Sequence, residues 1–121
     1  MIRFGLVLPD GDRGARLDRA RAADQVGVAA VLLTGPPGTE TVRAAAVATA
    51  TRWTRIAVAL AFGTEDPVTL AEEISVLDNL SNGRVVVVPR GADAGELQRF
   101  QEVLAGTVIR GVRLRPPPVQ P

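Results

Sequence analysis

Short apolar runs and longer amphipathic segments alternate along this chain. Four runs rich in Val, Ile, Leu and Ala cover residues 2–8, 28–33, 56–62 and 85–88. Each run is followed by small or turn-forming residues, and then by a segment in which apolar residues recur every three or four positions. The runs predict strands and the periodic segments predict helices. A regular strand–helix alternation is typical of an α/β protein with a parallel sheet.

The segment from residue 63 to residue 88 shows this organisation most completely. Asp66 offers a capping side chain, and Pro67 suits the first helical position, where a backbone N–H is not needed. The apolar stripe that follows consists of Leu70, Ile74 and Leu77. Asn82 and Gly83 tolerate a left-handed backbone and so predict the end of this helix. The run at 85–88 contains only Val, which predicts a strand covered on both faces.

The amino-acid composition excludes several kinds of catalytic and metal-binding chemistry for this chain. The 121 residues carry a net charge of +1, and all 14 basic residues are Arg, so the balance gives no reason to expect nucleic acid as a partner. The sequence has no Cys, His, Lys or Tyr. Disulfides, thiolate catalysis and Cys or His metal sites are therefore excluded, and no metal is expected. An enzyme of this composition needs a cofactor to carry its chemistry.

No targeting or membrane-spanning pattern is evident. Residue 1 is followed at once by a strand-like run, without the charged, apolar and small-residue pattern of a signal peptide. No apolar run reaches the length needed to span a bilayer, about 20 residues. The expectation is a soluble cytoplasmic protein with no membrane partner.

Charged residues on two predicted helices have structural interpretations. Arg16, Arg19 and Arg21 lie on the first helix, predicted at 14–26, and Arg13 directly precedes it. At these spacings they spread around the helix, which favours a solvated arginine-rich surface over a phosphate site. On the fourth helix, Asp93 and Glu96 have the spacing of a capping box, which argues against Glu96 as a catalytic acid.

Several sequence segments, in the right order, resemble the luciferase-like family of flavin- or deazaflavin-dependent oxidoreductases. The longest is LAEEISVLDNLSNGRVVVV at 70–88, and IRFGLVLP at 2–9, AADQVGVAAVLL at 22–33 and TRIAVAL at 54–60 precede it. The resemblance implies a TIM-type barrel, oxidoreductase or monooxygenase activity on a small molecule, and FMN or F420 as cofactor. The chain is short for that fold, because a complete barrel needs about 250 residues. The fold expected here is a parallel (βα)4 half of a TIM-type barrel with a proline-rich C-terminal tail.

A half-barrel leaves one side of its sheet uncovered. One domain is expected at 1–115, followed by the proline-rich tail at 116–121. Phe4, Leu8, Leu60 and Phe62 are the residues predicted to line the uncovered inner face. Large apolar faces and free strand edges are association sites. The chain is therefore expected to form a homo-oligomer of at least two copies or to pair with a longer partner chain, with the second and third helices at the interface, as the resemblance implies.

The cofactor-binding residues implied by the resemblance follow the four strands. They are Asp10, Thr34, Gly63, Thr64 and Arg90. In parallel α/β proteins, sites gather at the carboxyl ends of the strands. Gly63 permits a flat ring to lie against the backbone. Asp10 can equally be an ordinary turn residue, and glycine is common after strands.

The residues after the fourth strand leave two functions open. The family has small residues at that point, whereas this chain has Pro89 and Arg90. Arg90 either fills the space of the ring or contacts a cofactor phosphate. The first alternative favours a noncatalytic binding or interaction subunit derived from the family, and the second favours an oxidoreductase that is active when assembled with further chains. A small doubly wound domain with an unrelated ligand is a third possibility, against which the local resemblances argue.

Overall fold

The computed structural model describes residues 2–106, 108–109 and 112–113, and within them it shows four strand–helix units. The units are β1 (Gly5–Leu8) with α1 (Arg13–Val26), β2 (Ala30–Leu33) with α2 (Glu40–Ala50), β3 (Arg55–Ala61) with α3 (Pro67–Leu80), and β4 (Val85–Arg90) with α4 (Ala94–Leu104). The four strands are parallel and lie in the order β1-β2-β3-β4. The predicted (βα)4 arrangement is confirmed.

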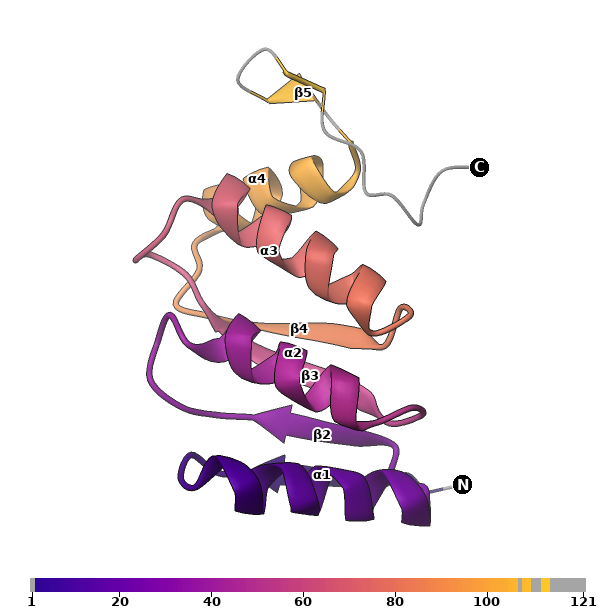
Figure 1. The fold of residues 1–121 in the computed structure, drawn as a ribbon. Coiled ribbons are helices and arrows are strands. Elements are labelled where there is room, and N and C mark those ends of the chain that lie inside the picture. Colours follow the sequence, from indigo (N-terminus) through magenta and orange to yellow (C-terminus); the bar gives the residue numbers. More distant parts are fainter. Residues whose placement is uncertain (1, 107, 110–111, 114–121) are drawn as a thin grey trace.

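All four helices lie on one side of the sheet (Figure 1). Sequential parallel strands joined by right-handed crossovers place every connecting helix on the same face. The strands point in one direction, so their carboxyl ends share one rim, and the helices begin at that rim (Figure 1). Beyond α4, β5 (Val108–Ile109) and β6 (Val112–Arg113) form a small antiparallel ribbon. The predicted tail at 116–121 lies outside the described residues.

The core lies between the helices and the sheet. Its strand residues include Leu8, Leu33, Val58 and Leu60, which are almost inaccessible to solvent. The predicted α3 stripe of Leu70, Ile74 and Leu77 is buried in the same cluster. Phe62 also belongs to it and meets Phe100 of α4 edge to face, with ring centroids 5.3 Å apart. Burial of this apolar layer is the main stabilising contribution to the fold.

The prediction that Leu8, Leu60 and Phe62 line the uncovered face is wrong, because all three are buried. Alternation along each strand assigns successive residues to opposite faces, so an error of one residue exchanges the two faces completely. Phe4 is 72% exposed, but it precedes the first residue of β1. The strand sequences are apolar on both faces, and the sequence therefore did not specify which set faces the helices.

The face opposite the helices is apolar, and nothing in the described part of the chain covers it. In the observed register, Val7, Leu32, Ala57 and Val86 form one row across all four strands. Val88 extends the same face along β4. Val7, Val86 and Val88 are 54%, 41% and 43% exposed. The prediction that the run at 85–88 is covered on both faces is thus wrong for this chain, because no element within the described residues packs on that side (Figure 1).

Asp24 near the end of α1 fixes the segment between α2 and β3. Its carboxylate accepts hydrogen bonds from the backbone N–H groups of Arg52, Trp53 and Thr54, at 2.9, 2.8 and 2.8 Å. Burial acts to raise the pKa of Asp24, but the three N–H donors and the nearby Arg84 charge outweigh it and lower the pKa overall. The charged form of Asp24 therefore stabilises the folded chain.

We expect acid to weaken this interaction. The folded-state pKa of Asp24 lies below the unfolded value, so its contribution is present above about pH 3.9 and is lost as the pH falls through the folded pKa. Urea unfolding of wild type and Asp24→Asn at pH 6 and pH 3 measures the effect. The Asp24→Asn variant should lose less stability on acidification than wild type does. Asp18→Asn, at an exposed position on the same helix, should lose as much stability as wild type. An equal loss in all three proteins would contradict this role of Asp24.

None of the helices within the described residues is long and apolar enough to cross a membrane.

Candidate functional site at the carboxyl rim of the sheet

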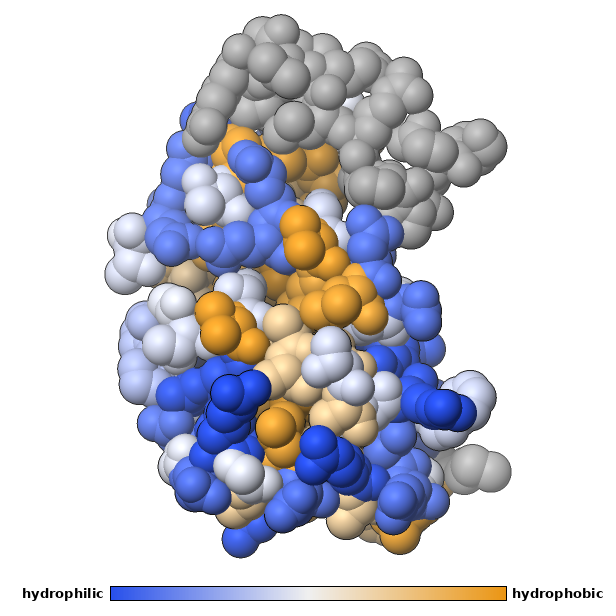
Figure 2. Space-filling view, in the orientation of Figure 1, coloured by the Kyte–Doolittle hydropathy of each residue, from blue (hydrophilic) through white to orange (hydrophobic). Residues whose placement is uncertain are grey.

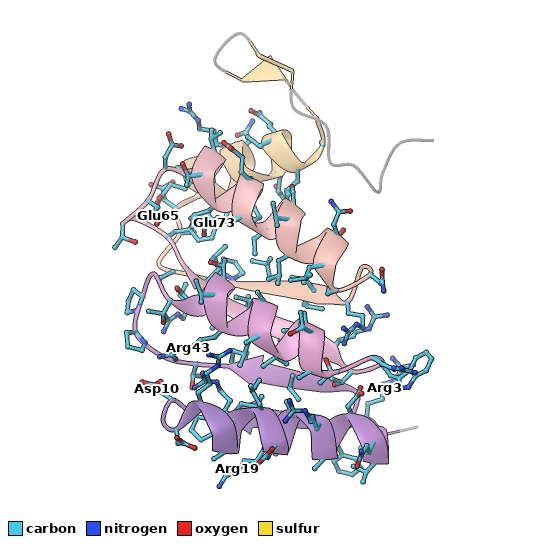
Figure 3. The ribbon with its side chains drawn as sticks, in the orientation of Figure 1. Arg3, Asp10, Arg19, Arg43, Glu65 and Glu73 are labelled. Atoms are coloured by element: carbon cyan, nitrogen blue, oxygen red, sulfur yellow. The ribbon has the colours of Figure 1, made fainter. Side chains whose placement is uncertain are left out.

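An arginine of α2 joins the ends of the first two strands. Arg43 Nη2 lies 2.6 Å from Asp10 Oδ1, and Arg43 Nη1 donates a hydrogen bond to the Thr34 carbonyl oxygen at 2.9 Å. Figure 3 shows Arg43 directed toward Asp10. The structure thus brings together two of the predicted site residues, Asp10 and Thr34, through a third that the sequence did not identify. The Asp10 side chain is 47% exposed. An ion pair this exposed to solvent orients the two side chains but adds little to the stability of the fold.

Gly35 makes room for Arg43. A Cβ atom at Gly35 would collide with the Arg43 guanidinium group, and the Gly35 φ of 155° is at the edge of the region that L-residues rarely adopt. A side chain at this position would push Arg43 away from Asp10 and Thr34. The glycine after β2 therefore has a local structural role at the rim, different from that of a phosphate-binding loop.

A second polar group links α2 to the ends of β3 and β4. Glu40, the first residue of α2, is only 4% exposed, and its Oε2 accepts a hydrogen bond from the Ala61 N–H at 2.9 Å. Arg90 Nη2 lies 3.9 Å from the same oxygen. Arg90 is the last residue of β4, whereas the sequence placed it after the strand. It pairs with Ala61 in the sheet and shares the strand face of Val86 and Val88, so it belongs to the uncovered side at the rim.

Gly63 and Thr64 lie beside this group and are exposed. Gly63 has a φ of 99°, in the left-handed region that favours glycine. A Cβ built at Gly63 meets no atom within 4 Å, so the backbone there is open to a ligand. The rim thus has an Asp10–Arg43–Thr34 group at β1 and β2, a Glu40–Arg90 group at β3 and β4, and an open glycine next to the second.

Glu73 of α3 has a perturbed acidity. Burial first, and then the negative charges of Glu65 and Glu40, raise its pKa, although the hydroxyl of Thr41 donates to its Oε1 at 3.2 Å. Figure 3 shows Glu65 and Glu73 near the start of α3. Within the described residues, no group of three His, Cys, Asp or Glu side chains could hold a metal ion. As far as the chain is described, the rim offers charged groups that can position and orient a ligand, and no activated nucleophile is among them.

Glu40 and Arg43 are the site residues that the sequence analysis missed. Their one signal is position: both lie in the first turns of the helix that follows β2, next to the rim where parallel sheets bind ligands. A glutamate at the first helical position is usually explained by the helix dipole alone. The burial of Glu40 depends on its neighbours Ala61 and Arg90, which are distant in sequence.

Four parallel strands with helices on one face, an uncovered apolar opposite face and polar groups at the carboxyl rim define the first half of a TIM-type barrel. A family model described as "Luciferase-like monooxygenase" matches residues 6–102. The chain belongs to this family. A search of curated proteins finds no match.

Three solved structures with a similar fold are named as enzymes, and the names of two of them include F420 or FMN. A coenzyme F420 dependent tetrahydromethanopterin reductase from Methanopyrus kandleri aligns with a TM-score of 0.66 at 17% identity, over 83% of this chain and 30% of the reductase chain. The monooxygenase RslO1 from Streptomyces bottropensis aligns with a TM-score of 0.62 at 23% identity, over 83% of this chain and 36% of the RslO1 chain. The third structure is a type II Baeyer-Villiger monooxygenase from Pseudomonas putida, the oxygenating constituent of 3,6-diketocamphane monooxygenase in complex with FMN. It aligns with a TM-score of 0.63 at 20% identity, over 82% of this chain and 32% of the monooxygenase chain. This chain therefore spans about a third of the length of each.

Proposed function

We propose that this chain supplies one half of the barrel of a cytoplasmic flavin- or F420-dependent oxidoreductase of the monooxygenase type, acting on a small molecule once assembled with a further chain. The observation that carries the proposal is the uncovered apolar face, which ends at a polar rim with an open glycine. Family membership and the FMN- and F420-linked names of the structural neighbours support the cofactor class.

The described residues fit the ring of such a cofactor better than its phosphate. A flat ring can approach the backbone at Gly63, where no neighbouring atom intervenes, and the apolar surface of Val86 and Val88 lies on the same side of the sheet as the rim residue Arg90. Asp10, Thr34, Thr64 and Arg90 are then the polar neighbours at the rim. The ring, when bound, supplies the redox chemistry. The chain supplies a surface that orients the ring and excludes water from it.

Arg90 distinguishes the enzyme from the alternative, a noncatalytic binding or interaction subunit. Its guanidinium group lies at the rim beside the buried Glu40, on the face where the ring would lie. If the Glu40–Arg90 contact holds the side chain in that position, it takes up the space of the ring. This contact is the specific observation that favours the noncatalytic alternative.

A flavin titration tests both roles. We expect wild type to bind FMN on the order of tens of micromolar or more weakly, which corresponds to no more than about 6–7 kcal/mol of binding energy. The measurement is quenching of flavin fluorescence, with Arg99→Gly on the exposed surface of α4 as the matched control. If Arg90 occupies the site of the ring, Arg90→Gly should gain affinity. If it contacts the cofactor phosphate, Arg90→Ala should lose affinity.

No binding by wild type or by Arg90→Gly, with an intact circular dichroism spectrum in each, would contradict the cofactor proposal. That outcome would favour the noncatalytic subunit. Repeating the titration with F420 separates the two cofactor classes, since both share the flat ring but differ in the attached groups.

The occupant we propose for the uncovered face is a second copy of this chain. Both β1 and β4 are edge strands, and they run in the same direction. In a two-fold arrangement, β4 of each copy can pair in parallel with β1 of the other, which closes eight strands into a barrel. A longer partner chain with the same half-barrel would meet the same geometry and is the alternative outcome.

The groove between α2 and α3 is a second surface open to contact with another chain. It is lined mostly by apolar side chains, among them Val42, Ala45, Val76 and Leu80. Figure 2 shows orange apolar side chains gathered over these helices. Val42 and Val76 are largely exposed. The groove supports the expectation that these two helices take part in an interface.

A further inference from the structure

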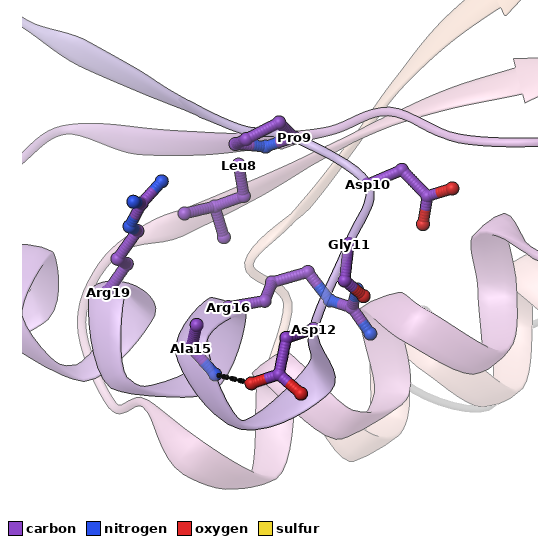
Figure 4. A pocket seen from close by; sticks show the side chains of 8 residues that line it. All are labelled: Leu8, Pro9, Asp10, Gly11, Asp12, Ala15, Arg16 and Arg19. Carbon is purple, nitrogen blue, oxygen red and sulfur yellow. Dashed lines mark hydrogen bonds between the residues drawn. The ribbon is translucent and has the colours of Figure 1, made fainter.

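A small pocket lies where β1 ends and α1 begins, on the side of the sheet that carries the helices. It has a volume of about 200 Å³ and is lined by residues that include Leu8, Asp10, Asp12, Arg16 and Arg19. Figure 4 shows these side chains around it. We call it the Arg16 pocket. It shares Asp10 with the rim of the proposed ring site but lies on the helix side of the sheet, whereas the ring would lie on the uncovered face and at Gly63.

Arg16 is a buried cation with an unused donor. The residue is only 7% exposed, contrary to the solvated arginine-rich helix that its spacing predicted. Its Nε has no hydrogen-bond partner, and its Nη1 reaches only the Gly11 carbonyl oxygen, at a long 3.5 Å. In Figure 4 the side chain extends along the pocket from α1 toward Gly11. A buried guanidinium group with an unpaired N–H carries a desolvation cost that a ligand oxygen would remove.

Arg19 adds a second positive charge, one helical turn from Arg16. Figure 4 shows its side chain extending beside Leu8. Among the described residues, neither Arg16 nor Arg19 takes part in an ion pair. The two carboxylates of the pocket are already engaged: Asp10 pairs with Arg43, and Asp12 accepts the Ala15 N–H at 2.9 Å as the cap of α1. The arginines are therefore the groups left to bind a ligand.

We propose that the Arg16 pocket binds a compact oxyanion, the phosphate or carboxylate terminus of a small molecule, through the guanidinium group of Arg16, with Arg19 adding positive charge at the other side of the pocket. Guanidinium groups present paired N–H donors that match both kinds of oxyanion. The volume suits one charged head group, whereas pockets for whole drug-sized ligands measure about 300–1,000 Å³. The start of α1 contributes a favourable field for negative charge as well.

Titration calorimetry with inorganic phosphate, at ionic strength matched with sodium chloride, tests the proposal on the whole chain. Wild type should bind phosphate saturably, with a dissociation constant of about millimolar, as expected for so small a ligand. Arg16→Lys keeps the charge and removes the Nε–H donor, and it should weaken binding at least about tenfold, or about 1.4 kcal/mol. Arg19→Ala should weaken binding severalfold. Arg21→Ala, which removes an exposed arginine paired with Asp18 on the same helix, should bind as wild type does.

Sodium acetate in a parallel titration separates the two sources of the oxyanion. Binding of phosphate alone assigns a phosphate site, and comparable binding of acetate assigns a carboxylate site. Phosphate and acetate that give no more heat than chloride would overturn the proposal. An equal loss of binding in Arg19→Ala and Arg21→Ala would also overturn it, because it would show only the general charge of α1. Arg19 and Arg21 are both exposed, so the comparison does not depend on whether the Arg16 variant folds.

Discussion

Replacing Arg84 with alanine is expected to lower the free energy of unfolding by about 2–4 kcal/mol, because several partly buried carbonyl groups would lose their donor. Arg84 follows α3 and donates to the carbonyl oxygens of Ala48, Thr51 and Thr54 at 3.0, 3.2 and 3.0 Å. It also donates to the Ser81 carbonyl at 2.7 Å and to the Thr51 hydroxyl at 2.9 Å. One side chain thus ties the ends of α2 and α3 to the start of β3.

Arg84→Lys provides the sharper test of this arrangement. Lysine keeps the positive charge, but its compact ammonium group cannot reach acceptors spread over two helix ends. We expect it to recover less than half of the lost stability in urea unfolding. Arg99→Ala, at an exposed position of α4, is the control and should change stability by less than about 0.5 kcal/mol. Full recovery in the lysine variant would show that charge alone matters and that the hydrogen-bond geometry does not.

Replacing Leu77 with alanine should destabilise the chain by about 2–5 kcal/mol, since it removes a buried side chain and leaves a cavity. Leu77 is 2% exposed and lies in the core cluster with Ile74 and Val58. The loss should be visible as a lower urea midpoint with little change in the slope of the transition.

Glu73→Gln is the matched control on the same helix. The pKa of Glu73 is raised by burial and by neighbouring negative charges, so removing its charge removes an unfavourable interaction. We expect this variant to equal or exceed wild type in stability at pH 7. Equal destabilisation by the Leu77 and Glu73 substitutions would mean that the buried face of α3 is assigned wrongly.

Local signals in the sequence were sufficient for the helices and their ends. Asp66 caps α3 through the Val68 N–H with Pro67 at the first position, and Asp93 and Glu96 form the predicted capping box of α4. Asn82 and Gly83 both have positive φ after α3, as their tolerance of that conformation predicts. These features depend on residues within about one helical turn, which the sequence shows directly.

The faces of the strands and the partners of the charged residues could not be predicted in the same way. The strands are apolar on both sides, so alternation did not distinguish the buried Leu60 from the exposed Val88. Glu40 and Arg84 find most of their partners more than 20 positions away in the sequence, after the strands and helices have packed. Arg16 is buried whereas Arg19 and Arg21 are exposed, a difference that depends on how α1 packs against the sheet. For the same reason, Asp10 and Thr34 were predicted but Arg43, which joins them, was not.

The molar mass of the purified 121-residue chain, measured by light scattering at micromolar concentration, tests the half-barrel account most directly. The uncovered face of Val7, Leu32, Ala57, Val86 and Val88 and the free edges of β1 and β4 predict a particle with twice the mass of one chain. Val88→Glu should shift that particle toward the monomer, because a charge would have to be buried in the closed barrel. A monodisperse wild-type monomer would contradict the account.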